Sequence, residues 1–198
     1  MKKFILLPIL LFSTCIFAHN EVGVKVGAEI TDTYFPLLEG KRVAVMTNQT
    51  GIAGEEHLMD LLVRHQFNIV GIFSPEHGFR GTADAGEHVA SSIDEKTGIP
   101  IWSLYGSGSG KPSPDKMKQF DVLLFDLQDV GLRFYTNYAA MTRLMDACAE
   151  HGKKMVVLDR PNPNGFYVDG PILDMKYKSG VGWLPIPVVH GMTLGELA

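Results

Sequence analysis

Short runs of apolar residues alternate with amphipathic segments along most of the chain. Four of these runs, residues 42–47, 68–73, 122–125 and 155–158, are typical of β-strands. The apolar positions in them are nearly continuous, which favours strands that are buried on both faces. Strands that alternate with helices predict a mostly parallel sheet with right-handed crossovers. We therefore expect an α/β fold of Rossmann-like type, with helices on both faces of the sheet.

The segments between these runs carry the signals of helices. Residues 55–65 place three leucines on one face, as in a crossover helix. Ser113-Pro114-Asp115 combines a serine N-cap, a proline at the first helical position and an acid near the positive helix end. Residues 135–150 repeat apolar positions at helical spacing, and Gly152 is expected to end that helix.

The end of the sequence predicts one more helix. Thr193-Leu194-Gly195-Glu196 is a capping-box pattern, which opens a helix. The sequence stops inside the first turn, far short of the roughly 12 residues that even a marginal isolated helix needs. We expect Ala198 to be a truncation point, so that residues 19–198 form a domain that is incomplete at its C-terminal end.

The first residues resemble an export signal. Lys2 and Lys3 precede an apolar run over residues 4–17, and the small Ala18 precedes a polar stretch. The run is too short for a stable membrane span. We expect a signal peptide over residues 1–18 and a periplasmic or extracellular protein, and a lipid anchor at Cys15 is the weaker alternative.

Composition narrows the class of protein further. The 198 residues are 45% hydrophobic, enough for one domain with its own core. The formal net charge of −4 becomes about −6 when the two lysines of the signal leave, and the other basic residues are scattered, which argues against a nucleic-acid partner. Without Cys15 the chain keeps only Cys148, so packing rather than a disulfide must stabilise the fold.

Polar residues gather directly after the apolar runs, including a fifth run at residues 186–189. In open parallel sheets, ligands bind beyond the carboxyl ends of the strands. Five strand ends are therefore expected to direct polar groups to one edge of the sheet. In chain order the clusters are Asn48 and Gln49; Glu76, His77 and Arg80; Asp126, Gln128, Asp129 and Arg133; Asp159, Arg160 and Asn162; and His190.

Each cluster also has a purely structural interpretation. Asn48 and Asp159 could cap turns, and Asn162 lies between two prolines, where turn chemistry alone can explain it. Asp126 could hold a loop through backbone hydrogen bonds, and Arg133 could pair with an acid.

Glu76 is the strongest candidate for catalysis. Pro75 favours an extended residue before it, and Gly78 permits a tight return, so the carboxyl group is held at a strand end. A protonated carboxylic acid is what glycosidic cleavage needs, because the leaving oxygen must receive a proton. The structural alternative is an ion pair with Arg80. The second carboxylate stays open among Asp84, Glu87, Asp126, Asp129 and Asp159, and an acetamido sugar could instead use its own carbonyl oxygen.

Three other functions can be built from the sequence. A phosphate loop at residues 106–111 fails on spacing, because three residues instead of four separate its outer glycines and Pro112 follows the lysine. A metal-dependent hydrolase could use Glu76, His77, His190 and Asp126, although no metal-binding motif is present. A non-catalytic glycan-binding module could use an aromatic platform of Phe79, Trp102, Tyr105 and Tyr135.

Several blocks in order resemble the NamZ-type exo-β-N-acetylmuramidases. They begin with Val43-Ala44-Val45-Met46-Thr47-Asn48-Gln49-Thr50-Gly51 and Phe73-Ser74-Pro75-Glu76-His77-Gly78-Phe79-Arg80-Gly81. They continue with Asp84-Ala85-Gly86-Glu87, Leu104-Tyr105-Gly106, Phe125-Asp126-Leu127-Gln128-Asp129-Val130-Gly131, Arg133-Phe134-Tyr135-Thr136, Leu158-Asp159-Arg160-Pro161-Asn162-Pro163 and His190-Gly191-Met192-Thr193. The resemblance runs from about Val43 to Ala198.

The resemblance implies a Rossmann-like catalytic domain that is followed by a smaller C-terminal domain, with the active site between them. It implies a glycosidase without cofactor or metal that releases terminal N-acetylmuramic acid from the non-reducing end of peptidoglycan fragments, with Glu76 as catalytic residue. One of Arg80, Arg133 and Arg160 is expected to bind the lactyl carboxylate of this sugar, because arginine binds carboxylates bidentately. The full set of expected substrate contacts is Asn48, Gln49, His77, Arg80, Tyr105, Asp126, Gln128, Arg133, Tyr135, Asp159, Arg160 and His190.

Overall fold

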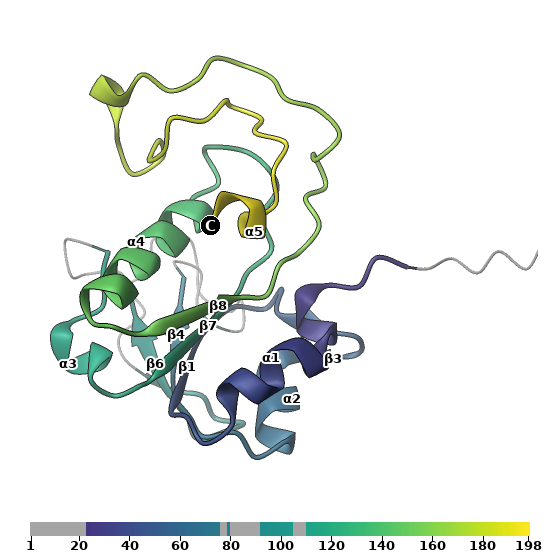
Figure 1. Ribbon diagram of the computed structural model, residues 1–198, viewed down its shortest axis with the longest axis vertical. Coiled ribbons are helices and arrows are strands. Elements are labelled where there is room, and N and C mark those ends of the chain that lie inside the picture. The colour runs from purple at the N-terminus through teal and green to yellow at the C-terminus, as the bar shows by residue number, and fades with distance from the viewer. Residues whose placement is uncertain (1–22, 76–78, 80–91, 105–109) are drawn as a thin grey trace, which may run out of the picture.

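The computed structural model describes residues 23–75, 79, 92–104 and 110–198. A six-stranded sheet lies between helices, and a two-stranded hairpin lies beside it (Figure 1). The strands are β1 (Val43–Thr47), β2 (Ile52–Ala53), β3 (Glu56–His57), β4 (Ile69–Ser74), β5 (Ser92–Ile93), β6 (Pro100–Ser103), β7 (Val122–Asp126) and β8 (Lys154–Val157). The helices are α1 (Thr31–Leu38), α2 (Leu58–Arg64), α3 (Pro114–Met117), α4 (Asn137–Glu150) and α5 (Leu194–Leu197), with 3-10 turns at Gly27–Glu29 and Met175–Tyr177.

The order of strands in the sheet is β5-β6-β4-β1-β7-β8. All neighbours are parallel except β5 and β6, which are antiparallel. The first parallel strand lies in the centre, the next two extend to one side and the last two to the other. This is the strand order of the doubly wound Rossmann arrangement, so the predicted fold class is confirmed.

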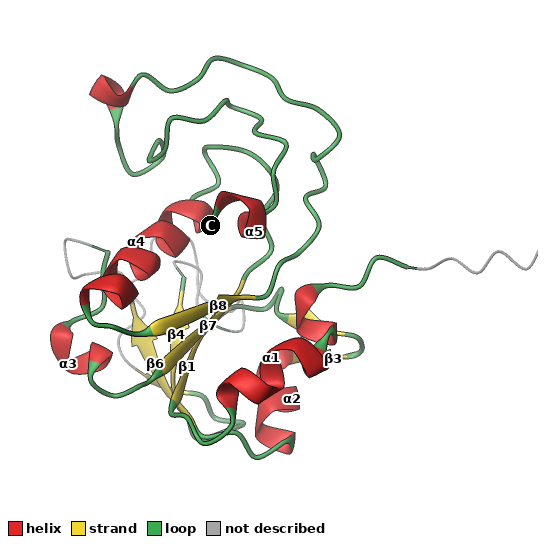
Figure 2. Cartoon of the chain, viewed as in Figure 1, coloured by secondary structure: helices red, strands yellow, loops and turns green. Residues whose placement is uncertain are grey.

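The central strands are buried on both faces, as the continuous apolar runs predict. Val43 and Val45 of β1 pack in one core cluster, and Ala44 and Met46 pack in the other, because successive side chains of a strand point to opposite faces. Helices α1 and α2 cover the first face, and α3, α4 and α5 cover the second (Figure 2).

Helix α2 begins three residues later than the sequence pattern indicates. Glu56 and His57 pair with Ala53 and Ile52 in the hairpin instead of forming the first helical turn. The Nδ1 atom of His57 then accepts a hydrogen bond of 3.1 Å from the backbone N–H of Met59, which caps the helix. A tertiary pairing thus overrides the helical preference of the segment.

Helices α3 and α5 begin where their predicted caps lie, whereas α4 begins at Asn137, two residues later than predicted. Ser113 is the N-cap of α3 and accepts from the backbone of Lys116. Helix α4 ends before Gly152, which has a φ of +62° that glycine adopts without strain. Thr193 and Glu196 form the capping box of α5.

The run at residues 186–189 is not a strand of the sheet, so that prediction was wrong. Val189 makes only isolated bridges, with Leu132 and Asp169. Pro185 and Pro187 have no N–H group to contribute to a ladder, which explains the lack of regular pairing. The chain between β8 and α5 instead runs out from the sheet and returns with little regular structure (Figure 1).

Candidate active site at the carboxyl edge of the sheet

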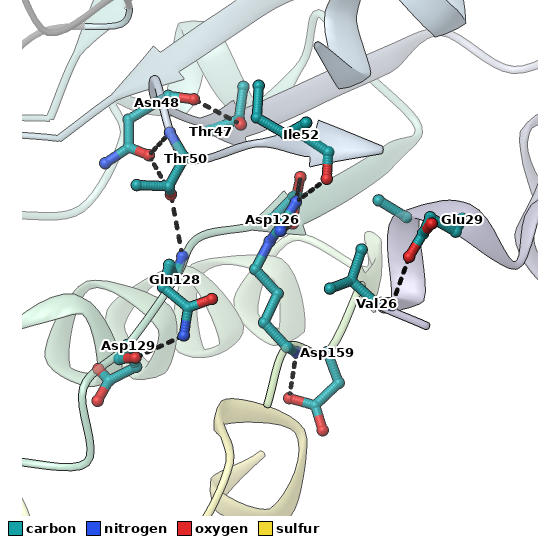
Figure 3. Close-up of polar contacts among 12 residues, drawn as sticks. Val26, Glu29, Thr47, Asn48, Thr50, Ile52, Asp126, Gln128, Asp129 and Asp159 are labelled. Atoms are coloured by element: carbon teal, nitrogen blue, oxygen red, sulfur yellow. Dashed lines mark hydrogen bonds and ion pairs between the residues drawn. The ribbon is translucent and has the colours of Figure 1, made fainter. Parts of the chain in front are cut away.

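The direction of winding reverses between β1 and β7, which are neighbours in the sheet but first and fourth among the parallel strands. Doubly wound sheets bind ligands at such a switch point, because the loops that leave the two strands separate there. The last residues of the two strands, Thr47 and Asp126, are paired in register. The polar residues that follow them lie close together (Figure 3).

The chain turns sharply after β1 around the side chain of Asn48. Its Oδ1 atom accepts hydrogen bonds from the backbone N–H of Thr50 at 2.9 Å and from the Thr50 hydroxyl at 2.6 Å (Figure 3). Its backbone carbonyl accepts from the Gly51 N–H at 2.9 Å and lies 2.8 Å from Nε2 of His57. The turn that the sequence left open as a structural role for Asn48 is therefore present.

Gln128 joins the loop after β7 to this turn and to the loop after β8. Its backbone N–H donates to the hydroxyl of Thr50 at 3.2 Å. Its side-chain Nε2 donates to the carbonyl oxygens of Asp129 at 2.7 Å and Pro161 at 2.9 Å. The side chain of Asn137, at the start of α4, donates to the backbone carbonyl of Gln128 at 2.8 Å.

Asp126 and Arg160 form a buried ion pair at the centre of this edge. Nε and Nη2 of Arg160 donate to the two oxygens of Asp126 at 2.6 and 2.9 Å. The side chains are 0% and 6% exposed for the acid and the base. Burial raises the pKa of Asp126, and the guanidinium opposes that effect. Nη2 also donates to the carbonyl of Ile52 at 2.9 Å, so the pair fastens the hairpin to the sheet.

Asp159 anchors the start of α5. Its Oδ1 accepts from the backbone N–H groups of Arg160 at 3.0 Å and Gly195 at 2.8 Å. Its Oδ2 accepts from the hydroxyl of Thr193 at 2.6 Å. Both oxygens are thus bound to protein donors, in line with the capping role that the sequence left open.

A pocket of about 370 Å³ opens next to Asp159 and Arg160. The segment before α1, including Lys25 and Gly27, forms one wall, and Pro161 and Thr193 contribute to it as well. The volume lies within the range of small-molecule sites.

Asp129 and His190 face each other in the interior behind Gln128. Nε2 of His190 is 3.8 Å from Oδ1 of Asp129, and the residues are 2% and 4% exposed. Oδ1 accepts from the N–H of Gly131 at 2.7 Å, whereas Oδ2 of Asp129 and Nε2 of His190 have no hydrogen-bond partner among the described residues. Burial raises the pKa of Asp129 to about 6 and lowers that of His190.

The remaining described candidates are Arg133, Gln49 and Tyr135. Nη1 of Arg133 donates to the carbonyls of Pro171 and Ile186, at 2.8 and 2.6 Å, and so holds the segment between β8 and α5. The side chains of Gln49 and Tyr135 are exposed.

Part of the predicted site lies outside the described residues. Strand β4 ends at Ser74 at the same edge, beside β1. The predicted residues within the undescribed ranges 76–78, 80–91 and 105–109 are Glu76, His77, Arg80, Asp84, Glu87 and Tyr105. Their roles stay predictions.

Sequence reasoning did not single out several residues that hold the site together. Thr50 links Asn48 to Gln128 across 78 positions of sequence, and an Asn-x-Thr spacing after a strand is typical of a side-chain-capped turn. Asn164 donates to the carbonyl of Val130 at 2.8 Å and ties two loops of this edge together. No local pattern predicts that contact.

Within residues 23–75, 79, 92–104 and 110–198, no three histidine, cysteine or acidic side chains are grouped so that they could hold a metal ion. In the same ranges, no helix has the length and apolar character that crossing a membrane requires.

Fold and site together define a class, the Rossmann-like α/β domains that carry a polar site at the topological switch point. Residues 43–198 match the family described as "Exo-beta-N-acetylmuramidase NamZ, N-terminal", and the chain belongs to this family. The resemblance deduced from the sequence blocks is confirmed.

Known relatives support the same conclusion. The chain is 48% identical over 168 residues to the peptidoglycan beta-N-acetylmuramidase NamZ of Bacillus subtilis (strain 168), a match that covers 83% of this chain and 40% of that protein. Two DUF1343 family proteins of Bacteroides fragilis NCTC 9343 have similar crystal structures. One is 62% identical with a TM-score of 0.78, over 88% of this chain and 45% of its own. The other is 40% identical with a TM-score of 0.79, over 87% and 44%. The chain thus spans less than half the length of these relatives.

Proposed function

We propose that this chain is the N-terminal part of an exo-β-N-acetylmuramidase that releases terminal N-acetylmuramic acid from the non-reducing end of peptidoglycan fragments. The observation that carries the proposal is the family match over residues 43–198. The polar network at the switch point supports it, because that is where doubly wound folds bind small ligands.

The proposed chemistry begins with Glu76 as the general acid. Its carboxyl group donates a proton to the glycosidic oxygen as the bond to the anomeric carbon breaks, and the sugar is then captured by water or by its own acetamido oxygen. Asp126 and Asp159 have both oxygens bound to protein donors, which favours a role for these two acids in holding the edge of the sheet together.

We assign the lactyl carboxylate of the substrate to Arg80. Arg133 and Arg160 already bind protein acceptors and are 7% and 8% exposed, which argues against them as the main contact. Arg80→Ala is expected to raise KM for muramic substrates more than for a neutral lactyl ester. Equal increases for both substrates would contradict the assignment.

We further propose that residues 1–18 direct export to the periplasm or the cell exterior, where peptidoglycan fragments occur. The apolar run after Lys2 and Lys3 supports this. Fractionation of cells that express the full-length protein, with sequencing of the mature N-terminus, tests it: a cytoplasmic protein that starts at Met1 would contradict the proposal.

The decisive experiment measures hydrolysis of a chromogenic N-acetylmuraminide by the full-length protein and by its Glu76→Gln variant. We expect turnover in the wild type and a loss of at least about 100-fold in kcat for the variant, with little change in substrate affinity, since general acid catalysis contributes roughly 10²–10⁴-fold. Turnover in the variant equal to that of the wild type would refute the role of Glu76. A wild type that binds the sugar without turnover would favour a glycan-binding module.

A further inference from the structure

Asn48 presents only hydrogen-bond donors to the switch point. The backbone N–H of Thr50 can only donate, so the Asn48 atom that it meets at 2.9 Å must be the carbonyl oxygen Oδ1. The Thr50 hydroxyl donates to the same oxygen at 2.6 Å. The amide nitrogen Nδ2 therefore points the other way, and no described residue accepts a hydrogen bond from it.

Gln128 has the opposite polarity. Its side-chain nitrogen faces two backbone carbonyls, those of Asp129 at 2.7 Å and Pro161 at 2.9 Å, which can only accept. Both hydrogens of Nε2 are thus used within the protein. The group that remains is Oε1, a pure acceptor.

The hydroxyl of Thr50 joins the side-chain amide of Asn48 to the backbone of Gln128. It accepts from the backbone N–H of Gln128 at 3.2 Å, so its own hydrogen is directed to Asn48. Rotation of the Asn48 amide would place two donors against each other, and rotation of the Gln128 amide would place an oxygen against two carbonyl oxygens. Each rotation would leave these donors and acceptors unpaired, which disfavours it.

We propose that Asn48 is a donor-only contact that binds an oxygen without hydrogen on the terminal sugar, whereas Gln128 offers only an acceptor. This inference rests on the proposed function. In N-acetylmuramic acid, the strong acceptors without hydrogen are the acetamido carbonyl and the lactyl carboxylate. The hydroxyl groups of the sugar can donate as well as accept, and so do not require a donor at this position.

Asn48→Asp isolates this polarity. The aspartate keeps an oxygen for both hydrogen bonds from Thr50, and it replaces the outward donor by a charged acceptor of nearly equal size. An acceptor on the ligand is then repelled, while a hydroxyl group can still bind by donating to the new oxygen. Asn48→Ser removes the outward Nδ2 donor and leaves only a shorter hydroxyl, without adding a charge. Asn68→Asp, exposed at the opposite edge of the sheet, is the matched control.

The experiment compares kcat/KM of the full-length protein and these variants on a chromogenic N-acetylmuraminide and on its lactyl methyl ester. We expect Asn48→Asp to lose about 10- to 100-fold and Asn48→Ser about 10-fold, which corresponds to about 1.4–2.8 kcal/mol and about 1.4 kcal/mol. Asn68→Asp should match the wild type. A larger loss of Asn48→Asp on the free acid than on the ester identifies the carboxylate, and equal losses identify the acetamido carbonyl.

Activity of Asn48→Asp within threefold of the wild type on both substrates would overturn the inference. If Asn48→Asp unfolds, as its melting temperature would show, the same criterion applies to Asn48→Ser. A wild type without turnover refutes the proposed function instead, and the polarity of Asn48 is then decided by calorimetric binding of free N-acetylmuramic acid to the same variants. Unchanged affinity there would overturn the inference.

Discussion

Asp129→Asn is expected to change the free energy of unfolding in a pH-dependent way. Relative to the wild type, the variant should be more stable at neutral pH than it is at low pH. Asp129 is 4% exposed, and Oδ2 has no hydrogen-bond partner among the described residues. The hydrogen bond from Gly131 to Oδ1 does not compensate for loss of water, so the pKa of this carboxyl rises from 3.8 to about 6. Asparagine keeps an oxygen for Gly131 and carries no charge.

The sign follows from proton linkage. A carboxyl whose pKa is higher in the folded state binds its proton more tightly there, so it contributes stability below pH 3.8 that is lost as the pH rises through about 6. The full difference is about 3 kcal/mol at 1.36 kcal/mol per pH unit, and roughly 2 kcal/mol of it falls between pH 4.5 and 7.5. Asp129→Asn has no carboxyl group to ionise at this position, so the variant does not lose this stability as the pH rises.

The assay is urea unfolding of wild type and Asp129→Asn at pH 4.5 and 7.5, followed by tryptophan fluorescence with circular dichroism as a second probe. We expect the free energy of unfolding of the variant, relative to the wild type, to be higher by about 2 kcal/mol at pH 7.5 than at pH 4.5. The buried His190 affects stability in the opposite direction. Its pKa is lowered in the folded protein, so the stability that it contributes is lost as the pH falls. A difference between the two proteins that does not change with pH would refute the reasoning.

Two further predictions concern packing at the same sheet. Arg160→Ala leaves the charge of Asp126 buried and unpaired, so it should lower the free energy of unfolding by about 3–5 kcal/mol. Arg42→Ala breaks an exposed ion pair and should lower it by less than about 1 kcal/mol. Similar losses for the two variants in urea unfolding would contradict this prediction. In Gly71→Ala the new Cβ would lie 2.3–2.4 Å from the indole of Trp102, so we expect a loss of about 1–3 kcal/mol and a lower Tm. Gly180→Ala, where no atom lies within 4 Å, is the control, and equal Tm values for the two alanine variants would refute the clash.

Much of the fold could be predicted because its signals are local. The apolar runs that became β1 and β7 are buried throughout, and a strand buried on both faces needs no alternation. The caps of α3 and α5 consist of hydrogen bonds between residues three positions apart, so they are visible in the sequence. Strand β6 was not predicted, because it is only four residues long and begins at Pro100.

The candidate site was predictable only as a set of residue types at one edge. That Asn48, Asp126 and Asp159 follow apolar runs could be read from the sequence, and the parallel arrangement brought them to the carboxyl edge. Their individual contacts could not be read, since any of several bases could have paired with either acid. The sequence also favoured two arginines for the substrate that the structure pairs within the protein.

The sequence by itself determined the family, the α/β class, the strands β1, β4, β7 and β8 and the helices α2 to α5 of this protein, because periodicity, caps and turns act over a few residues. It did not predict α1 or the short strands β2, β3, β5 and β6. Only the tertiary structure decided which distant polar groups face each other: Arg160 meets Asp126 across 34 positions, and the hydroxyl of Thr50 meets the backbone N–H of Gln128 across 78. Those choices depend on distances of about 3 Å between segments that become neighbours only when the sheet forms. The orientation of the Gln128 amide, whose Nε2 donates to the carbonyl of Pro161 in another loop, is likewise a property of the folded sheet edge.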